Sequence, residues 1–153
     1  MCAAQSHKRR PTMARILIPI DGSETALRAV RWVIEQIRAG ANHQVSLLNV
    51  QPEILSGHAR AYFTKTDLDA FMAEQAQEQL APAQKLLTEA NIPYESSFER
   101  GHAPMVIADQ AKKQGFDQIV MGTRGLNRVS GLLLGSVATG VLHLVDIPVT
   151  LIK

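Results

Sequence analysis

Three glycines and a serine near the end of the chain have spacing typical of a phosphate-binding loop. Gly122 ends an apolar run, Gly125 follows three residues later, and Gly135-Ser136 comes after nine intervening residues. Glycines let main-chain N–H groups approach a ligand, and a helix start adds unpaired N–H groups and a positive dipole end. The pattern therefore predicts a loop that holds nucleotide phosphates, although a tight strand-to-helix turn would also explain the glycines.

Two charged side chains stand where they could assist such a loop. Asp21 follows the apolar run Arg15–Ile20 and could meet a ribose, a base edge or a bound Mg²⁺, or serve only as a turn former or helix cap. Arg124 lies between the first two loop glycines and could offer its guanidinium to a phosphate, or be a solvated loop residue.

Other motifs of nucleotide or hydrolytic chemistry are missing from the sequence. It has no Gly-Lys-Ser/Thr of a Walker A loop, no Gly-x-Gly-x-x-Gly after the first apolar run and no Gly-x-Ser-x-Gly elbow. The five histidines are scattered without metal-ligand spacing. We therefore predict no metal site apart from Mg²⁺ held through Asp21, and no catalytic residue. His102 and His143 could touch a ligand, but we expect surface or capping roles.

Charge is unevenly distributed along the 153 residues. The net charge is +2, from 16 basic and 14 acidic residues, and Lys8, Arg9 and Arg10 all precede Met13. The rest of the chain thus has 13 basic and 14 acidic residues, which argues against a nucleic-acid partner. The basic cluster could bind polyanions, but a solvated, disordered tail is the simpler interpretation.

Composition also bears on location. The only cysteine is Cys2, so no internal disulfide can form, which fits a reducing cytoplasm. The uncharged stretch 129–145 is too short and polar for a membrane span, and the apolar run after Arg10 is too short for a secretory signal. We expect a cytoplasmic protein without a membrane partner.

Strand-like and helix-like segments alternate along the chain. The expected strands are Arg15–Ile20, Val45–Val50, Tyr94–Glu99, Asp117–Met121 and Pro148–Lys153. The expected helices are one capped by Asp21 or Ser23 and ended by Gly40, one from a capping box at Thr66–Asp69 to Asn91 with a bend or reset at Pro82, one opened by Pro104, and Ser136–Leu144. The segment Pro52–Lys65 is irregular and long enough to be a flap.

This alternation predicts an α/β fold with a parallel sheet and helices on both faces. Ligands of such sheets bind beyond the carboxyl ends of the strands, where the strand order reverses. The ends available there are Pro19–Asp21, Val50 and Met121–Gly122.

Over Ala14–Lys153 the chain resembles the universal stress protein family. The resemblance rests on the opening ILIPIDGS, the loop Gly-x2-Gly-x9-Gly-Ser, and the closing PVTLI; the loop pattern marks the ATP-binding branch of that family. It implies a disordered tail over residues 1–13 and one domain over 14–153. That domain would have a Rossmann-like fold, similar to adenine nucleotide α-hydrolases, with five parallel strands in the order 3-2-1-4-5.

The resemblance also implies a set of ATP contacts. Pro19, Asp21 and Val50 would face adenine and ribose, Gly122, Arg124, Gly125, Gly135, Ser136 and Val137 would surround the phosphates, and Met121 would lie in the same cleft. The family tends to form homodimers through its last strand, and here Val149–Ile152 is an apolar strand protected only by Lys153.

These observations favour a stress-response or signalling module that binds ATP, with or without Mg²⁺, and hydrolyses little or none of it. Fast phosphoryl transfer needs a charge clamp, a metal and a group that positions the nucleophile, but residues 122–136 contain two arginines and neither lysine nor acid. Two alternatives stay open: a nucleotide-free dimeric interaction module, and a slow nucleotide-hydrolysing enzyme with a second pocket under the Pro52–Lys65 flap.

Overall fold

The computed structural model describes residues 13–53, 64–125 and 134–153. Its strands are β1 (Ala14–Pro19), β2 (His43–Gln51), β3 (Tyr94–Arg100), β4 (Gln118–Gly122) and β5 (Val149–Ile152). Its helices are α1 (Glu24–Arg38), α3 (Lys65–Glu89), α4 (Ala103–Lys113) and α5 (Ser136–Leu144). The tail expected before Met13, most of the expected flap and the centre of the glycine loop lie outside the described residues.

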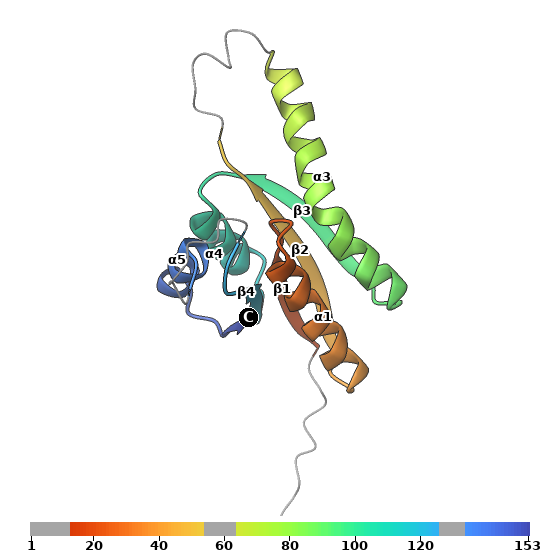
Figure 1. Cartoon of the computed structure of the whole chain (residues 1–153). Helices are drawn as coiled ribbons and strands as arrows, with labels where there is room; N and C mark the ends of the chain where they lie inside the picture. Colours follow the sequence, from red (N-terminus) through yellow and green to blue (C-terminus); the bar gives the residue numbers. More distant parts are fainter. Residues whose placement is uncertain (1–12, 54–63, 126–133) are drawn as a thin grey trace, which may run out of the picture.

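The five strands form one parallel sheet in the order β3-β2-β1-β4-β5, as predicted (Figure 1). β1 lies at its centre, with β2 on one side and β4 on the other. Along the chain, β2 and β3 are added on one side of β1, and β4 and β5 are then added on its other side. The strand order therefore reverses between β1 and β4, and a crevice opens there beyond the carboxyl ends of the strands.

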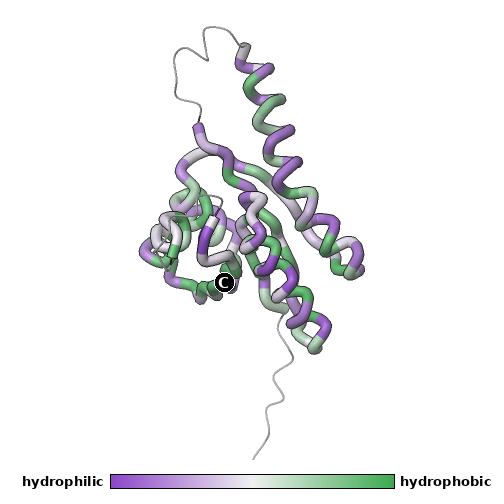
Figure 2. Tube along the Cα trace, viewed as in Figure 1, coloured by the Kyte–Doolittle hydropathy of each residue, from purple (hydrophilic) through white to green (hydrophobic). Residues whose placement is uncertain are grey.

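Alternate residues of the buried strands point to opposite faces of the sheet, and each face is covered by helices. Ile16 and Ile18 pack in a core beneath α1 and α3, whereas Leu17 packs in a second core beneath α4 and α5. Figure 1 shows the two helix pairs on opposite sides of the sheet, and Figure 2 shows apolar residues concentrated on the sheet and the helix sides that face it. This double burial explains why the central strands are continuous apolar runs.

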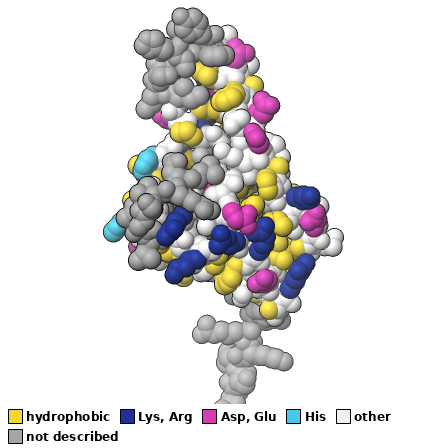
Figure 3. Space-filling view, in the orientation of Figure 1, with side chains coloured by type: hydrophobic (Ala, Val, Ile, Leu, Met, Phe, Trp, Pro, Cys, Tyr) yellow, Lys and Arg dark blue, Asp and Glu magenta, His cyan; other side chains and the backbone are white. Residues whose placement is uncertain are grey.

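The opposite side of α1 carries its charges. Arg28, Arg31, Glu35 and Arg38 are all exposed, as the helical spacing predicts. Arg31 pairs with Glu24 over 2.5 Å. Figure 3 shows basic and acidic side chains interspersed over the part of this face where α1 lies in Figure 1. This arrangement is typical of a solvated helix surface.

The predicted capping box of α3 was placed two residues too late. The box forms between Thr64 and Asp67, not between Thr66 and Asp69. Thr64 has the extended conformation of an N-cap residue (φ −71°, ψ 161°), whereas Thr66 is already helical. Asp69 instead pairs with Arg100 at the end of β3, over 2.7 Å.

Other predicted helix ends are confirmed. Ser23 caps α1 by accepting a hydrogen bond from the N–H of Ala26 over 3.2 Å. Gly40 follows that helix with a φ of +103°, and Asn91 follows α3 with a φ of +56°. α3 continues as one helix through Pro82. These ends place Asp21 and the start of α1 at the crevice.

Candidate functional site

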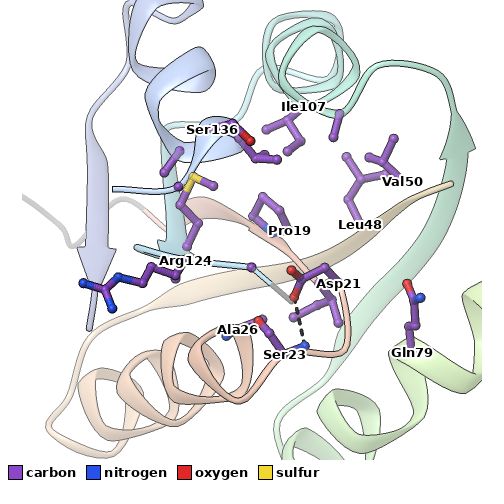
Figure 4. Close-up of a pocket in the computed structure, with 18 of the residues that line it drawn as sticks. Pro19, Asp21, Ser23, Ala26, Leu48, Val50, Gln79, Ile107, Arg124 and Ser136 are labelled. Atoms are coloured by element: carbon purple, nitrogen blue, oxygen red, sulfur yellow. Dashed lines mark hydrogen bonds between the residues drawn. The ribbon is translucent and has the colours of Figure 1, made fainter. Parts of the chain in front are cut away.

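A cavity of about 490 Å³ occupies the crevice between β1 and β4. The ten residues predicted to bind the nucleotide all line it: Pro19, Asp21, Val50, Met121, Gly122, Arg124, Gly125, Gly135, Ser136 and Val137. They come from four elements and two connections (Figure 4). The volume lies in the range of small-molecule sites. Direct contact of each residue with a ligand stays a prediction.

Part of the cavity wall is apolar. Pro19, Leu48 and Val50 line it from the strand ends, and Ala103 and Ile107 line it from α4. The contribution of α4 was not anticipated from sequence, because Ala103 and Ile107 differ in no local feature from other apolar helix residues. These five side chains form a slot that suits a flat, largely apolar group such as a nucleobase.

Another part of the cavity wall is the glycine loop, and its described segments on either side of residues 126–133 are hydrogen-bonded to each other. Thr123 donates its N–H to Ile152 O of β5 over 2.8 Å, and its carbonyl accepts the N–H of Gly135 over 2.7 Å. The N–H of Gly135 is therefore bonded within the protein and is not free to bind a ligand. Ser136 and Val137 begin α5 and have no partner for their N–H groups within the helix. They are the best-placed main-chain donors for an anion.

The start of α1 packs tightly against the same loop. A Cβ atom on Gly122 would lie 2.8 Å from Cβ of Thr25. Thr25 Oγ1 also donates a hydrogen bond to the carbonyl of Arg124. Ser23 N–H donates to Oδ1 of Asp21 over 2.9 Å, which makes Asp21 the turn former that the sequence suggested as one alternative. Gly122 thus has a structural role beside any role in binding.

Arg124 lines the cavity but is exposed. In Figure 4 its side chain extends away from Asp21 and Ser136. The predicted contact between its guanidinium and a phosphate therefore requires a different side-chain conformation from the one in this structure.

Charged groups are few around the cavity. Among the described residues that line it, Asp21 is the only carboxylate and Arg124 the only cation. Over residues 13–53, 64–125 and 134–153, no three His, Cys, Asp or Glu side chains are grouped so that they could hold a metal ion. None of the helices in those ranges has the length and apolar composition of a membrane span.

Three hydrogen-bonded side-chain amides beside the cavity, two of them buried, were missed by the sequence analysis. Asn49 and Gln51 of β2 and Gln79 of α3 form a hydrogen-bonded cluster, and Gln51 and Gln79 line the cavity. Gln79 lies between the buried residues Ala76 and Leu80. A glutamine near the buried face of an amphipathic helix is a weak signal for such a cluster.

The fold and the cavity define an α/β protein of the Rossmann-like class with a site at the reversal of strand order. Residues 13–153 match the model of the universal stress protein family, and the chain belongs to that family. A universal stress protein of Thermus aquaticus is 32% identical over 145 residues, covering 90% of this chain and 97% of the relative. Universal stress protein MJ0531 of Methanocaldococcus jannaschii is 28% identical over 141 residues, covering 91% of this chain and 81% of the relative.

Solved structures of the family share the fold. The structure of hypothetical protein MJ0577 has a TM-score of 0.76 and 27% identity, covering 91% of this chain and 94% of its own. A universal stress protein family protein of Arabidopsis thaliana was solved with AMP bound (TM-score 0.66, 20% identity, 92% and 91% covered). The universal stress protein of Archaeoglobus fulgidus was solved in complex with dAMP. Its TM-score is 0.65 and its identity 22%, covering 94% of this chain and 100% of its own. Members of this fold thus bind adenine nucleotides.

Proposed function

We propose that this chain binds ATP in the cavity between β1 and β4 as a nucleotide-dependent module of the stress response. The observation that carries the proposal is the composition of the cavity wall, which combines apolar side chains of the strand ends and α4 with the N-terminus of α5. An adenine ring fits the first and phosphates fit the second. The adenine nucleotides in the two solved relatives support the same class of ligand.

We expect slow hydrolysis or none. Asp21 is the single described carboxylate on the cavity wall and could contact Mg²⁺, but phosphoryl transfer also needs a residue that positions the attacking water. ATP would then act by stabilising one conformation or assembly of the protein. We also propose a cytoplasmic location. We further propose a homodimer through β5, because among the described strands β5 pairs only with β4 and leaves its other edge open.

Mass spectrometry of small molecules released from freshly purified, denatured protein gives the first test. We expect an adenine nucleotide at a substantial fraction of the protein concentration. Calorimetry with ATP should then give a dissociation constant below millimolar. Absence of both signals would overturn the proposal and favour the nucleotide-free interaction module.

Two substitutions at Ser136 separate the contribution of the helix N-terminus from that of the hydroxyl. Ser136 is the first residue of α5, and Gly135 before it has φ −74° and ψ 163°, a conformation that permits a following proline. Ser136→Pro therefore removes one N–H group while the helix is retained, and Ser136→Ala removes only the hydroxyl. We expect Ser136→Pro to weaken ATP binding about tenfold more than Ser136→Ala, because hydrogen bonds to charged groups are strong. Equal affinities would exclude this N–H as a phosphate donor.

A further inference from the structure

A buried cluster of side-chain amides borders the cavity beside α3, and the proposed ATP contacts leave it without a role. Asn49 has no exposed surface, Gln51 is 8% exposed, and Gln79 is half-buried. Burial of amide groups costs free energy unless they are hydrogen-bonded, so such clusters have defined partners. The partners here determine what Gln79 can offer to a ligand.

A main-chain carbonyl sets the orientation of all three amides. Asn49 Nδ2 donates to Ile20 O over 2.8 Å, and a carbonyl can only accept. The same Nδ2 donates to Gln79 Oε1 over 2.7 Å. Gln51 Nε2 donates to Asn49 Oδ1 over 2.7 Å and to Gln79 Oε1 over 3.3 Å. The oxygen of Gln79 therefore faces the cluster, and its Nε2 donates no hydrogen bond to any other described residue.

Gln79 also packs against the turn that carries Asp21. A Cβ atom on Gly22, the next residue, would lie 3.3 Å from Cγ of Gln79, and Gly22 has a φ of +82°. In Figure 4 Asp21 and Gln79 both lie on the side of the cavity opposite Ser136. The Asp21 carboxylate is an acceptor when ionised, and the free group of Gln79 is a donor. The cavity wall thus offers an acceptor at Asp21, beside Gly125 of the glycine loop, and a donor at Gln79.

We propose that Gln79 and Asp21 together recognise the ribose of the bound nucleotide. Asp21 accepts the O–H of one ribose hydroxyl, and Gln79 Nε2 donates to a hydroxyl oxygen. Gln79 is then a specificity-determining residue that favours ribonucleotides over 2′-deoxyribonucleotides, and Asn49 and Gln51 are positioning residues that hold its amide. This inference rests on the proposed function, since it requires an adenine nucleotide in the cavity.

Affinities for ATP and 2′-deoxy-ATP, measured by calorimetry on the whole chain, test the proposal. We expect wild type to bind ATP about tenfold more tightly, since the deoxynucleotide leaves polar groups of the site unpaired. Gln79→Met has a side chain of similar length without an amide, and it should reduce the preference to about threefold or less. Gln77→Met is the matched control, because Gln77 is exposed on the same helix and does not line the cavity.

The ratio of the two affinities is a readout that a purely structural role would not change. Gln79→Met removes an acceptor of Asn49 Nδ2 and lowers stability, but both ligands are measured on the same protein. Equal binding of ATP and 2′-deoxy-ATP by wild type would overturn the ribose role while the proposed function stands. An equal loss for both ligands in Gln79→Met would also overturn it. If wild type binds neither nucleotide, the proposed function itself fails.

Nuclear magnetic resonance of the wild type gives a second measurement that needs no variant. The side-chain NH₂ signals of Gln79 should shift with ATP and shift less with 2′-deoxy-ATP. Identical shifts with the two ligands would contradict the proposal even if Gln79→Met does not fold.

Discussion

Asp21 and Gly125 approach so closely that a Cβ atom on residue 125 would lie 2.6 Å from Oδ2 of Asp21. Asp21 follows β1 and Gly125 follows β4, so this contact joins the two strand ends between which the sheet order reverses. The other carboxylate oxygen accepts the N–H of Ser23 over 2.9 Å. The glycine at 125 is therefore what allows the carboxylate to occupy its place beside the cavity.

Gly125→Ala should destabilise the protein and weaken ATP binding, because the added methyl group must displace Asp21 or the loop. Overpacking of this kind costs about 1–3 kcal/mol. Urea unfolding measures the loss. In an Asp21→Ala background Oδ2 is absent, so the same substitution should cost much less. Fully additive losses in this double-mutant cycle would show that the close contact is not the cause.

Thr25→Val should lower the free energy of unfolding and also weaken ATP binding. Valine keeps the shape of the side chain that packs on Gly122 but removes the hydroxyl that donates to the carbonyl of Arg124. One neutral hydrogen bond contributes about 1 kcal/mol, so urea unfolding should show a loss of about that size, and ATP binding weakens because the loop is held less firmly in its binding geometry. Thr88→Val, at an exposed position of α3, is the control and should leave binding unchanged. If Thr25→Val binds ATP with wild-type affinity, the hydrogen bond from Thr25 to Arg124 does not hold the loop in its binding geometry.

Asn49→Leu should be strongly destabilising. Leucine has a similar volume but cannot donate to Ile20 O or Gln79 Oε1, and it leaves those buried oxygens with fewer partners. We expect a loss of about 2 kcal/mol or more in urea unfolding. Asn42→Leu, at an exposed position just before β2, should change stability by less than about 0.5 kcal/mol. Similar effects of the two substitutions would mean that the buried amide cluster contributes little to folding.

Local signals in the sequence were sufficient for the strands and for the ends of the loop, whereas the strand order was implied by the resemblance to the universal stress protein family. Continuous apolar runs indicate strands buried on both faces, and Gly122, Gly125 and Gly135 precede a helix whose start at Ser136 was predicted correctly. Sheet order then brought ten residues from separate segments to one cavity. The alternation of strands and helices predicted a parallel sheet, and the resemblance supplied the strand order that brings these residues together.

Features that depend on distant partners could not be predicted. Gln79 bonds to residues 28 and 30 positions away, and nothing near it in the sequence marks that partnership. The α3 cap was ambiguous for a different reason. Thr64–Asp67 and Thr66–Asp69 both have the Thr-x-x-Asp spacing, and only the backbone conformation distinguishes them.

That cap gives a prediction for pH. Asp67 accepts hydrogen bonds from Oγ1 of Thr64 over 2.5 Å and from its N–H over 3.0 Å, and the two bonds, that of the hydroxyl first, hold the pKa of Asp67 below its ordinary value. A lowered pKa in the folded state means that ionised Asp67 stabilises the fold above the pKa of the unfolded chain. This stabilisation is lost as the pH falls through the folded pKa.

Thr64→Ala removes the hydroxyl, so the pKa of Asp67 should rise toward its ordinary value, and the stability difference from wild type should narrow as the pH falls. Titration of the Asp67 carboxyl carbon by nuclear magnetic resonance measures the pKa directly. Thr66→Ala changes the same residue type one position before Asp67 and should leave that pKa in place. If Thr66→Ala raises it as much as Thr64→Ala does, the cap hydroxyl is not what keeps the carboxylate ionised.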